Sequence, residues 1–383
     1  MKDRIIKISV IIARLIVGLT FVLSGFSKAI DPLGTQYKLH DYLEAVSLSA
    51  YVPDLFLLAT SVALSAFEFT LGVLILLAVA RRFVSRITVV FMFFMTVLTV
   101  WIYAADPVQD CGCFGDAIVL NNAETLLKNI ILLALSVVIA VFPTAIDRLF
   151  SRGNQLLLFQ GSVIVSVMLS MWCLYDLPLI DFRPYHVGAD IRKGMEIPEG
   201  AEEPVFDTTF ILEKDGVRKE FTLDEYPDST WTFIDSKTVT VKQGYVPPIH
   251  DFSIVTADGE DITDNILSNK GYTFLLISPY LENADDGNFG VIDQIYEFAD
   301  DNDIPFYCLT ASNEESIERW KDLTGAEYPF CQTDGTTLKT IIRSNPGLVM
   351  LKGGVVVAKW SHNRLPDSET LLTIINGTNT SRK

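Results

Sequence analysis

The chain has 383 residues, of which 49% are hydrophobic. Its mean hydropathy is +0.32 and its formal net charge is −17. Residues 1–180 hold 12 Lys/Arg and 12 Asp/Glu, which leaves 18 against 35 for the rest, so an apolar, neutral front precedes an acidic back. This charge disfavours nucleic acid and anionic lipid as partners, and five cysteines spread over the chain are no disulfide scaffold.

Five segments of the front half are long and apolar enough to cross a bilayer, which requires roughly 20 helical residues. They run approximately over 5–30, 55–80, 83–105, 123–142 and 156–175. The first is interpreted as a retained span, because it is long and lacks a small-residue cleavage site of a secretory signal. We therefore predict an α-helical membrane bundle over 1–150 and a fifth transmembrane helix over 151–180.

Basic residues in the short connections predict the orientation, because Lys and Arg favour the cytoplasmic side. They precede the first span and follow the second and the fourth: Lys2, Arg4, Lys7, Arg81, Arg82, Arg86, Arg148 and Arg152. The amino terminus is thus predicted to be cytoplasmic. The carboxy-terminal half and the loops 31–54 and 106–121 then lie outside, on the periplasmic side of a bacterial inner membrane.

Arg14 and Glu68 lie deep within predicted spans, where burial of a charge in lipid is costly. Arg14 in the first span and Glu68 in the second lie at similar depths from the cytoplasmic side if both helices rise ~1.5 Å per residue. We expect them to form an ion pair. Such a pair either clasps two helices structurally or lines a pathway for protons or substrate.

The loop after the third span reads Asp110-Cys111-Gly112-Cys113-Phe114-Gly115-Asp116. Two thiols one residue apart allow three interpretations: a structural disulfide, a redox-active pair or a shared metal. A bond across one residue is strained and easily reduced, which favours redox work. A metal would need further ligands, and four scattered histidines, with only His40 in the other outer loop, give no cluster, so no metal site is predicted.

Several motifs of the front half occur in this order: Arg14-Leu15-Ile16-Val17-Gly18, Ser24-Gly25-Phe26-Ser27-Lys28, Glu68, and the cysteine loop. Together they resemble the DoxX-like membrane superfamily, and most closely its MauE-like, redox-associated branch, named for methylamine utilisation. The resemblance covers roughly residues 5–150 and implies a four-helix membrane bundle associated with disulfide formation in periplasmic proteins. It also marks Lys28, with Arg14 and Glu68, as an intramembrane charge to consider.

This chain departs from quinone-coupled disulfide generators, which usually carry Cys-x-x-Cys beside the quinone and a second cysteine pair. Here the motif is Cys-x-Cys, and the first outer loop holds no cysteine. The cofactor is therefore unknown, with a quinone as the candidate that the resemblance suggests.

Beyond the membrane part, residues 181–244 are predicted to be a small β-rich linking element, packed between membrane and outer domain, with strands over 205–212, 218–223 and 231–234. A hairpin turn is expected at 213–217. Residues 245–383 alternate strands and helices: strands at 274–278 and 305–309, helices at 289–300 and 314–324, and a hairpin over 348–358. This order predicts a mixed sheet flanked by helices.

The outer domain is similar to thioredoxins, with Pro346, in Asn345-Pro346-Gly347-Leu348, at the place of their cis-proline. Where thioredoxins carry Cys-x-x-Cys, this chain has 278–283, Ser-Pro-Tyr-Leu-Glu-Asn. The domain therefore lacks a nucleophilic thiol there. Cys308 and Cys173 are expected to be buried and inert, whereas Cys331 keeps a redox role or a bond to Cys308 as alternatives.

Three functions follow from these patterns. The first is a membrane thiol–disulfide oxidoreductase in which Cys111 and Cys113 exchange electrons with a periplasmic client or redox partner. The second is a membrane-anchored binding or assembly factor that grips a client with its thiol-free domain. The third is a transporter component that uses Arg14 and Glu68. The client and the oligomeric state are not determined by the sequence.

Overall fold

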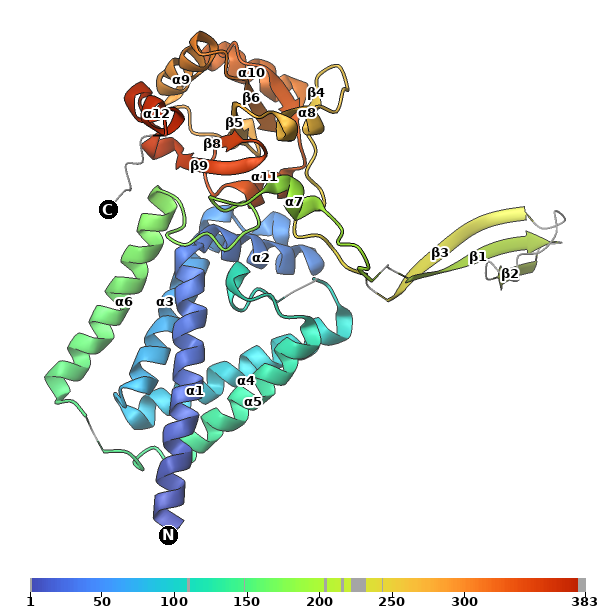
Figure 1. Ribbon diagram of the computed structural model, residues 1–383. Coiled ribbons are helices and arrows are strands. Elements are labelled where there is room, and N and C mark those ends of the chain that lie inside the picture. The colour runs from blue at the N-terminus through green and yellow to red at the C-terminus, as the bar shows by residue number, and fades with distance from the viewer. Residues whose placement is uncertain are drawn as a thin grey trace.

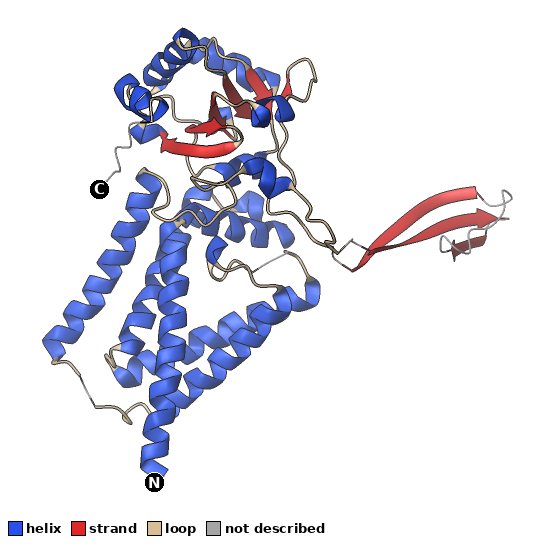
Figure 2. Cartoon of the chain, in the orientation of Figure 1, coloured by secondary structure: helices blue, strands red, loops and turns tan. Residues whose placement is uncertain are grey.

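The computed structural model describes residues 2–108, 111–147, 149–202, 205–214, 217–221, 232–242 and 244–377. Figures 1 and 2 show a bundle of long helices, an α/β domain at one end of it, and a separate small sheet. Some sequence predictions fall outside the described residues: Asp110, Arg148, the turn at 215–216, and residues 222–223 and 231 at strand ends.

The front half is helical throughout. Its helices are α1 (Lys2–Ile30), α2 (Pro32–Ala45), α3 (Asp54–Leu76), α4 (Arg81–Ala105), α5 (Asn122–Val141) and α6 (Arg152–Tyr175), with short 3-10 turns η1 (Ser49–Tyr51) and η2 (Gly115–Ala117). All except α2 are long and apolar enough to cross a membrane. The five predicted spans are thus confirmed as helices, and the fold class of a helical bundle followed by an α/β domain is confirmed as well.

Helix α2 occupies most of what the sequence analysis treated as an outer loop. Asp31 starts it as N-cap, with its carboxylate accepting a hydrogen bond from the Gly34 amide at 2.9 Å, and Pro32 stands at the first helical position. Both features are standard helix starts. The sequence does not predict this helix as a span, because its apolar content is too low.

Helices α1 and α3 approach each other closely through glycines. A Cβ at Gly25 would lie 2.3 Å from the backbone nitrogen of Phe69, and one at Gly72 would lie 2.6 Å from that of Val22. Small residues at such crossings allow the dense packing that holds helices together in lipid. This crossing fixes the register of α1 against α3 and therefore the level of every charge along them.

The carboxy-terminal domain is built on a six-stranded sheet in the order β4-β7-β6-β5-β8-β9. Its strands are β4 (Val255–Thr256), β5 (Tyr272–Ser278), β6 (Phe306–Thr310), β7 (Phe330–Gln332), β8 (Gly347–Lys352) and β9 (Val355–Ser361). Strands β5, β6 and β7 are parallel, whereas β8 runs antiparallel to β5 and β9 antiparallel to β8. The central strand β5 is covered on both faces, since Phe274 and Leu276 join one core and Leu275 and Ile277 the other.

Helices surround this sheet as predicted. They are α8 (Thr263–Ser268), α9 (Phe289–Asp301), α10 (Glu314–Thr324), α11 (Gly335–Ile341) and α12 (Ser368–Ile375), with 3-10 turns η3 (Leu281–Asn283) and η4 (His362–Arg364). The Asn345–Pro346 peptide bond is cis, as the sequence predicts.

The linking stretch divides into two parts. Residues 181–202, with the short helix α7 (Ile191–Met195), pack onto the carboxy-terminal domain, where Tyr185 and Ile191 enter its core and Asp190 bridges Val355. Strands β1 (Val205–Lys214), β2 (Val217–Phe221) and β3 (Thr232–Lys242) form an antiparallel sheet in the order β2-β1-β3. Its expected position between membrane and outer domain was wrong, since Figure 1 shows the strands projecting away from both.

Candidate functional site at the cysteine loop

The cysteine loop connects α4 to α5, and its two ends are tied together. Asn121 and Glu124 form a capping box at the start of α5, which satisfies two amides that a helix leaves open. The Asn122 side-chain amide donates to Asp106 Oδ1 at 2.8 Å, just after α4 ends. The hydrogen bond between Asn122 and Asp106 therefore holds the two ends of the loop together.

Glycines give the loop its shape. Gly112 and Gly115 have φ values of +62° and +55°, a region that favours glycine, and the Gly115 amide donates to the Gly112 carbonyl at 3.1 Å. A Cβ on Gly112 would also stand 3.0 Å from Cγ of Lys38. The Tyr42 hydroxyl of α2 donates to the Cys111 carbonyl at 2.6 Å. Helix α2 thus supports the turn that carries both cysteines.

The two thiols of the loop are free and interact with each other. The hydrogen bond from Cys111 lowers the pKa of Cys113 to about 6; burial opposes this, and the charges of Lys128 and Lys28 add to it. The same hydrogen bond, together with burial, raises the pKa of Cys111. The hydrogen bond and the nearby lysines thus make Cys113 the more acidic thiol of the pair, with Cys111 as the donor.

Directly beneath the loop lies a buried polar cluster of Ser24, Lys28 and Glu68. Lys28 Nζ is 2.6 Å from Glu68 Oε2 and donates to Ser24 Oγ at 2.9 Å. Ser24 Oγ lies 2.7 Å from Glu68 Oε2 and 2.6 Å from the Cys113 carbonyl oxygen, so its one proton serves either acceptor. Both charged side chains are about 5% exposed or less.

The expected Arg14–Glu68 ion pair was wrong, because Glu68 pairs with Lys28 instead. Arg14 Nε donates to the Ile75 carbonyl at 2.9 Å, near the end of α3. Ile75 is seven residues beyond Glu68, about 10 Å along the helix. Helix α1 begins well below the level where α3 ends, so counting depth from the start of each span misplaced Arg14.

A narrow pocket extends from Cys113 into the bundle. Its walls are mostly apolar side chains of α1, α4 and α5, and its polar lining includes Lys28, Glu68, Lys128 and Asn129. Lys128 Nζ stands 4.5 Å above the ring centre of Phe114, next to Cys113 in the chain. The sequence analysis did not single out Lys128; its place seven residues after the loop's end cap is a weak signal alone.

The carboxy-terminal domain contacts this end of the bundle through Arg343. Its guanidinium binds Asp31 with Nε at 2.9 Å and 3.0 Å from the two carboxylate oxygens and a terminal nitrogen at 2.9 Å, and the same nitrogen lies 3.4 Å from Asp116. Burial would raise the pKa of Asp31, but the charge and hydrogen bonds of Arg343 lower it. This buried ion pair therefore joins two parts of the chain that the sequence analysis did not connect.

The face of the domain that carries the cis-proline points to the bundle. Lys339 Nζ stands 5.0 Å from the ring centres of both Tyr37 of α2 and Tyr280 of the segment 278–283. Within that segment the Ser278 hydroxyl donates to Asn345 Oδ1 at 2.7 Å, and the Asn345 amide donates to the Tyr280 carbonyl at 2.9 Å. The segment 278–283, which stands where thioredoxins carry their dithiol, is thus held by hydrogen bonds to Asn345.

The remaining cysteines are buried. Cys308 and Cys331 lie on neighbouring strands as free thiols, and burial raises the pKa of both. Cys331 is 2% exposed and forms no disulfide with Cys308, so that alternative for Cys331 was wrong. Cys173 is packed within α6, as expected.

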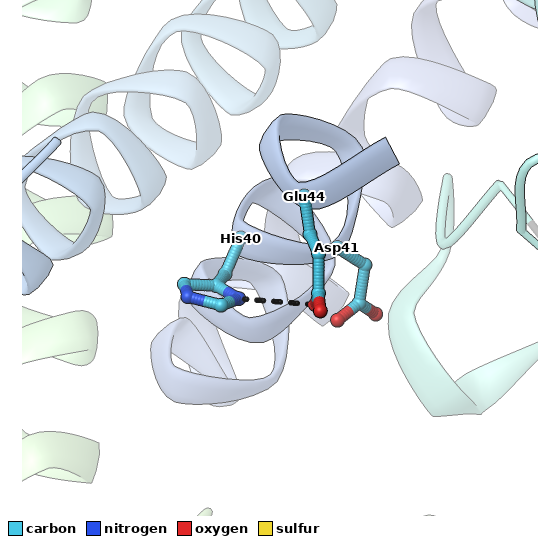
Figure 3. Close-up of side chains that lie close together, drawn as sticks. All are labelled: His40, Asp41 and Glu44. Atoms are coloured by element: carbon cyan, nitrogen blue, oxygen red, sulfur yellow. Dashed lines mark ion pairs between the residues drawn. The ribbon is translucent and has the colours of Figure 1, made fainter. Parts of the chain in front are cut away.

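Among the described residues, metal-ligand side chains gather on α2 rather than at the cysteines. Figure 3 shows His40, Asp41 and Glu44 together, with ligand atoms all within 4.8 Å of one another and His40 Nδ1 4.0 Å from Glu44. Asp41 and Glu44 are exposed. Consecutive turns of a helix bring such side chains together without an ion, so we assign no metal role to them.

Comparisons with known proteins agree with this architecture. Residues 6–142 match the family described as Methylamine utilisation protein MauE, and residues 206–243 match a Domain of unknown function (DUF8463). No curated protein matches the chain.

Two solved structures resemble the chain over one third of its length. A candidate protein disulfide isomerase from Bacteroides thetaiotaomicron is 16% identical with a TM-score of 0.28, covering 33% of this chain and 86% of its own. A thioredoxin-like protein from Aeropyrum pernix is 15% identical with a TM-score of 0.27, covering 33% and 89%. The chain is a multi-pass membrane protein whose residues 6–142 are similar to the MauE family, followed by an α/β domain.

Proposed function

We propose that this protein is a thiol–disulfide oxidoreductase of a bacterial inner membrane, which works on periplasmic protein thiols through Cys113 and Cys111. The observation that carries the proposal is the geometry of the loop: two free thiols one residue apart lie above the buried Lys28–Glu68 pair, and Ser24 binds the Cys113 carbonyl. The bias of basic residues toward the amino-terminal side of the membrane supports the orientation.

The exchange balances without further groups. A client thiolate attacks the sulfur of Cys113 in the oxidised Cys111–Cys113 pair, and Cys111 leaves and takes up a proton. A second client thiolate then attacks the client sulfur of this mixed disulfide and releases Cys113 as a thiolate. The client loses two electrons, which the cysteine pair gains. A low pKa makes Cys113 the better leaving group in the second step.

The cluster beneath the loop supports this chemistry in two ways. Ser24 binds the Cys113 carbonyl, which holds the backbone of the reactive residue. Lys28 and Lys128 place positive charge near the sulfur and favour its thiolate. Glu68 keeps Lys28 in position through their 2.6 Å contact.

Regeneration of the disulfide requires an acceptor of two electrons, for which the family resemblance suggests a quinone. The pocket beside Cys113 is lined by apolar side chains such as Phe91 and Met95 and by the polar side chains of Lys128 and Asn129, but its cavity volume is only about 30 Å³. That is about the volume of one water molecule, so a quinone ring does not fit in it and no residues are assigned to hold one. A quinone would accept both electrons and two protons.

The other two functions lose the observations that motivated them. A transporter built on an Arg14–Glu68 pair has no such pair, because Arg14 binds the Ile75 carbonyl. A client gripped at the cis-proline face would have to displace Tyr37 and Asp31 of the bundle, which already contact that face.

The test is the redox state of Cys111 and Cys113 in growing cells, read by thiol trapping with a mass-tagged maleimide before and after a brief pulse of reductant. We expect the pair to be reduced by the pulse and then to recover at a rate that depends on respiration. Cys111→Ser cannot form the Cys111–Cys113 disulfide, so oxidation of client thiols should be lost, whereas the control Cys308→Ser should oxidise them like the unaltered chain. A pair that stays oxidised throughout would make the loop a structural staple and refute the proposal.

A further inference from the structure

One arginine of the carboxy-terminal domain contacts both the bundle and the cysteine loop. Arg343 lies just after α11 and binds Asp31, at the corner between α1 and α2. The same guanidinium nitrogen reaches Asp116, which lies in η2 three residues after Cys113. Three segments far apart in the chain thus meet at a single side chain.

The two contacts differ in strength. Arg343 is buried, and the Asp31 side chain is 15% exposed and bound through three hydrogen bonds, a geometry that gives firm and directional pairing. The Asp116 side chain is 43% exposed and lies at 3.4 Å. The Asp31 contact therefore holds the domain on the bundle, and the Asp116 contact ties the cysteine loop to the same arginine.

We propose that Arg343 is a positioning residue for Cys113. When the thioredoxin-like domain is docked, Arg343 clamps the cysteine loop to the α1–α2 corner. The inference rests on the proposed function of the cysteine pair. It assigns the thiol-free domain a role within this chain: it holds the reactive loop over Lys28 and beside Lys128.

The loop side of the clamp has its own structural support. Gly115 starts η2 with positive φ, so the chain turns sharply between Cys113 and Asp116, and Phe114 is buried against the bundle. With Asp116 released, the half-exposed end of the loop loses its tie to the domain, while Ser24 and Tyr42 still bind the carbonyls of Cys113 and Cys111. We therefore expect the loop to loosen without unfolding of the bundle.

The experiment measures the pH profile of Cys113 alkylation in the full chain, reduced and reconstituted in lipid nanodiscs, with iodoacetamide as the probe and peptide mass spectrometry as the readout. Arg343→Ala removes both contacts and Asp116→Ala removes only the loop contact. Arg364→Ala is the matched control, because it breaks the 2.6 Å pair with Asp176 between the same domain and the end of α6.

In the unaltered chain we expect a midpoint near pH 6. Arg343→Ala and Asp116→Ala should both raise this midpoint, because a loosened loop moves Cys113 away from Lys28 and Lys128, whereas Arg364→Ala should leave it unchanged. For Asp116→Ala a rise is diagnostic, since loss of a nearby negative charge alone would lower the pKa of Cys113. Arg343→Lys keeps the positive charge but loses the forked hydrogen bonding of the guanidinium. Its midpoint should lie between those of the unaltered chain and Arg343→Ala. If Arg343→Ala does not fold, Asp116→Ala alone decides.

Two results would overturn the inference, and they are distinguishable. An unchanged midpoint in Asp116→Ala, beside a low midpoint in the unaltered chain, refutes the clamp and leaves the proposed function intact. A midpoint near that of an ordinary thiol, about pH 8.5, in the unaltered chain refutes both the clamp and the proposed function.

Discussion

The Lys28–Glu68 pair offers the sharpest test of the site's electrostatics. Glu68 accepts a hydrogen bond from Lys28 at 2.6 Å, Ser24 Oγ lies 2.7 Å from the same carboxylate oxygen, and both charged side chains are almost completely buried. Removing one partner of a buried pair leaves an uncompensated charge, which costs about 3–5 kcal/mol. We therefore expect Lys28→Met and Glu68→Gln each to lower the free energy of unfolding by this amount.

The double variant removes both charges together and should cost less than the sum of the single changes, with a coupling of about 2–3 kcal/mol, typical of residues in contact. Unfolding of the full chain in mixed detergent micelles, titrated with sodium dodecyl sulfate and followed by circular dichroism, measures each value. Arg14→Leu with Glu68→Gln is the control cycle. It should be additive within about 0.5 kcal/mol, because Arg14 binds the Ile75 carbonyl. Additivity of Lys28 with Glu68 would refute the pairing.

Three further predictions concern packing and reactivity. Gly25→Ala should destabilise the bundle by more than about 2 kcal/mol, because its Cβ would meet the Phe69 backbone, whereas Gly161→Ala in α6, with nothing within 4 Å, should be neutral or slightly stabilising in the same titration. Cys113 alkylation should accelerate as pH rises through about 6 and level off above 7, because the thiolate reacts; a rise continuing to pH 9 would contradict this. Cys308 should stay unlabelled by maleimide until the domain unfolds, and labelling in the native protein would disprove its burial.

Much of the architecture follows from the sequence, because it depends on local patterns. The lengths of the apolar runs gave the five spans, and the continuous run at 274–278 predicted a strand covered on both faces. The cis bond at Pro346 and the missing dithiol at 278–283 follow from short motifs. The cysteine loop was singled out for its spacing, which no fold is needed to see.

The partners of the charges were decided only by the tertiary structure. Both Arg14 and Lys28 lie on α1, and the glycine crossing of α1 with α3 sets a register that places Lys28, not Arg14, beside Glu68. The sequence gives neither that register nor the point at which α1 begins below α3. Arg343 and Asp31 are 312 residues apart in the chain, so no local sequence pattern predicts their contact. Helices, strands and short motifs depend on neighbouring residues in the chain, whereas the pairing of buried charges depends on how whole helices and domains pack together.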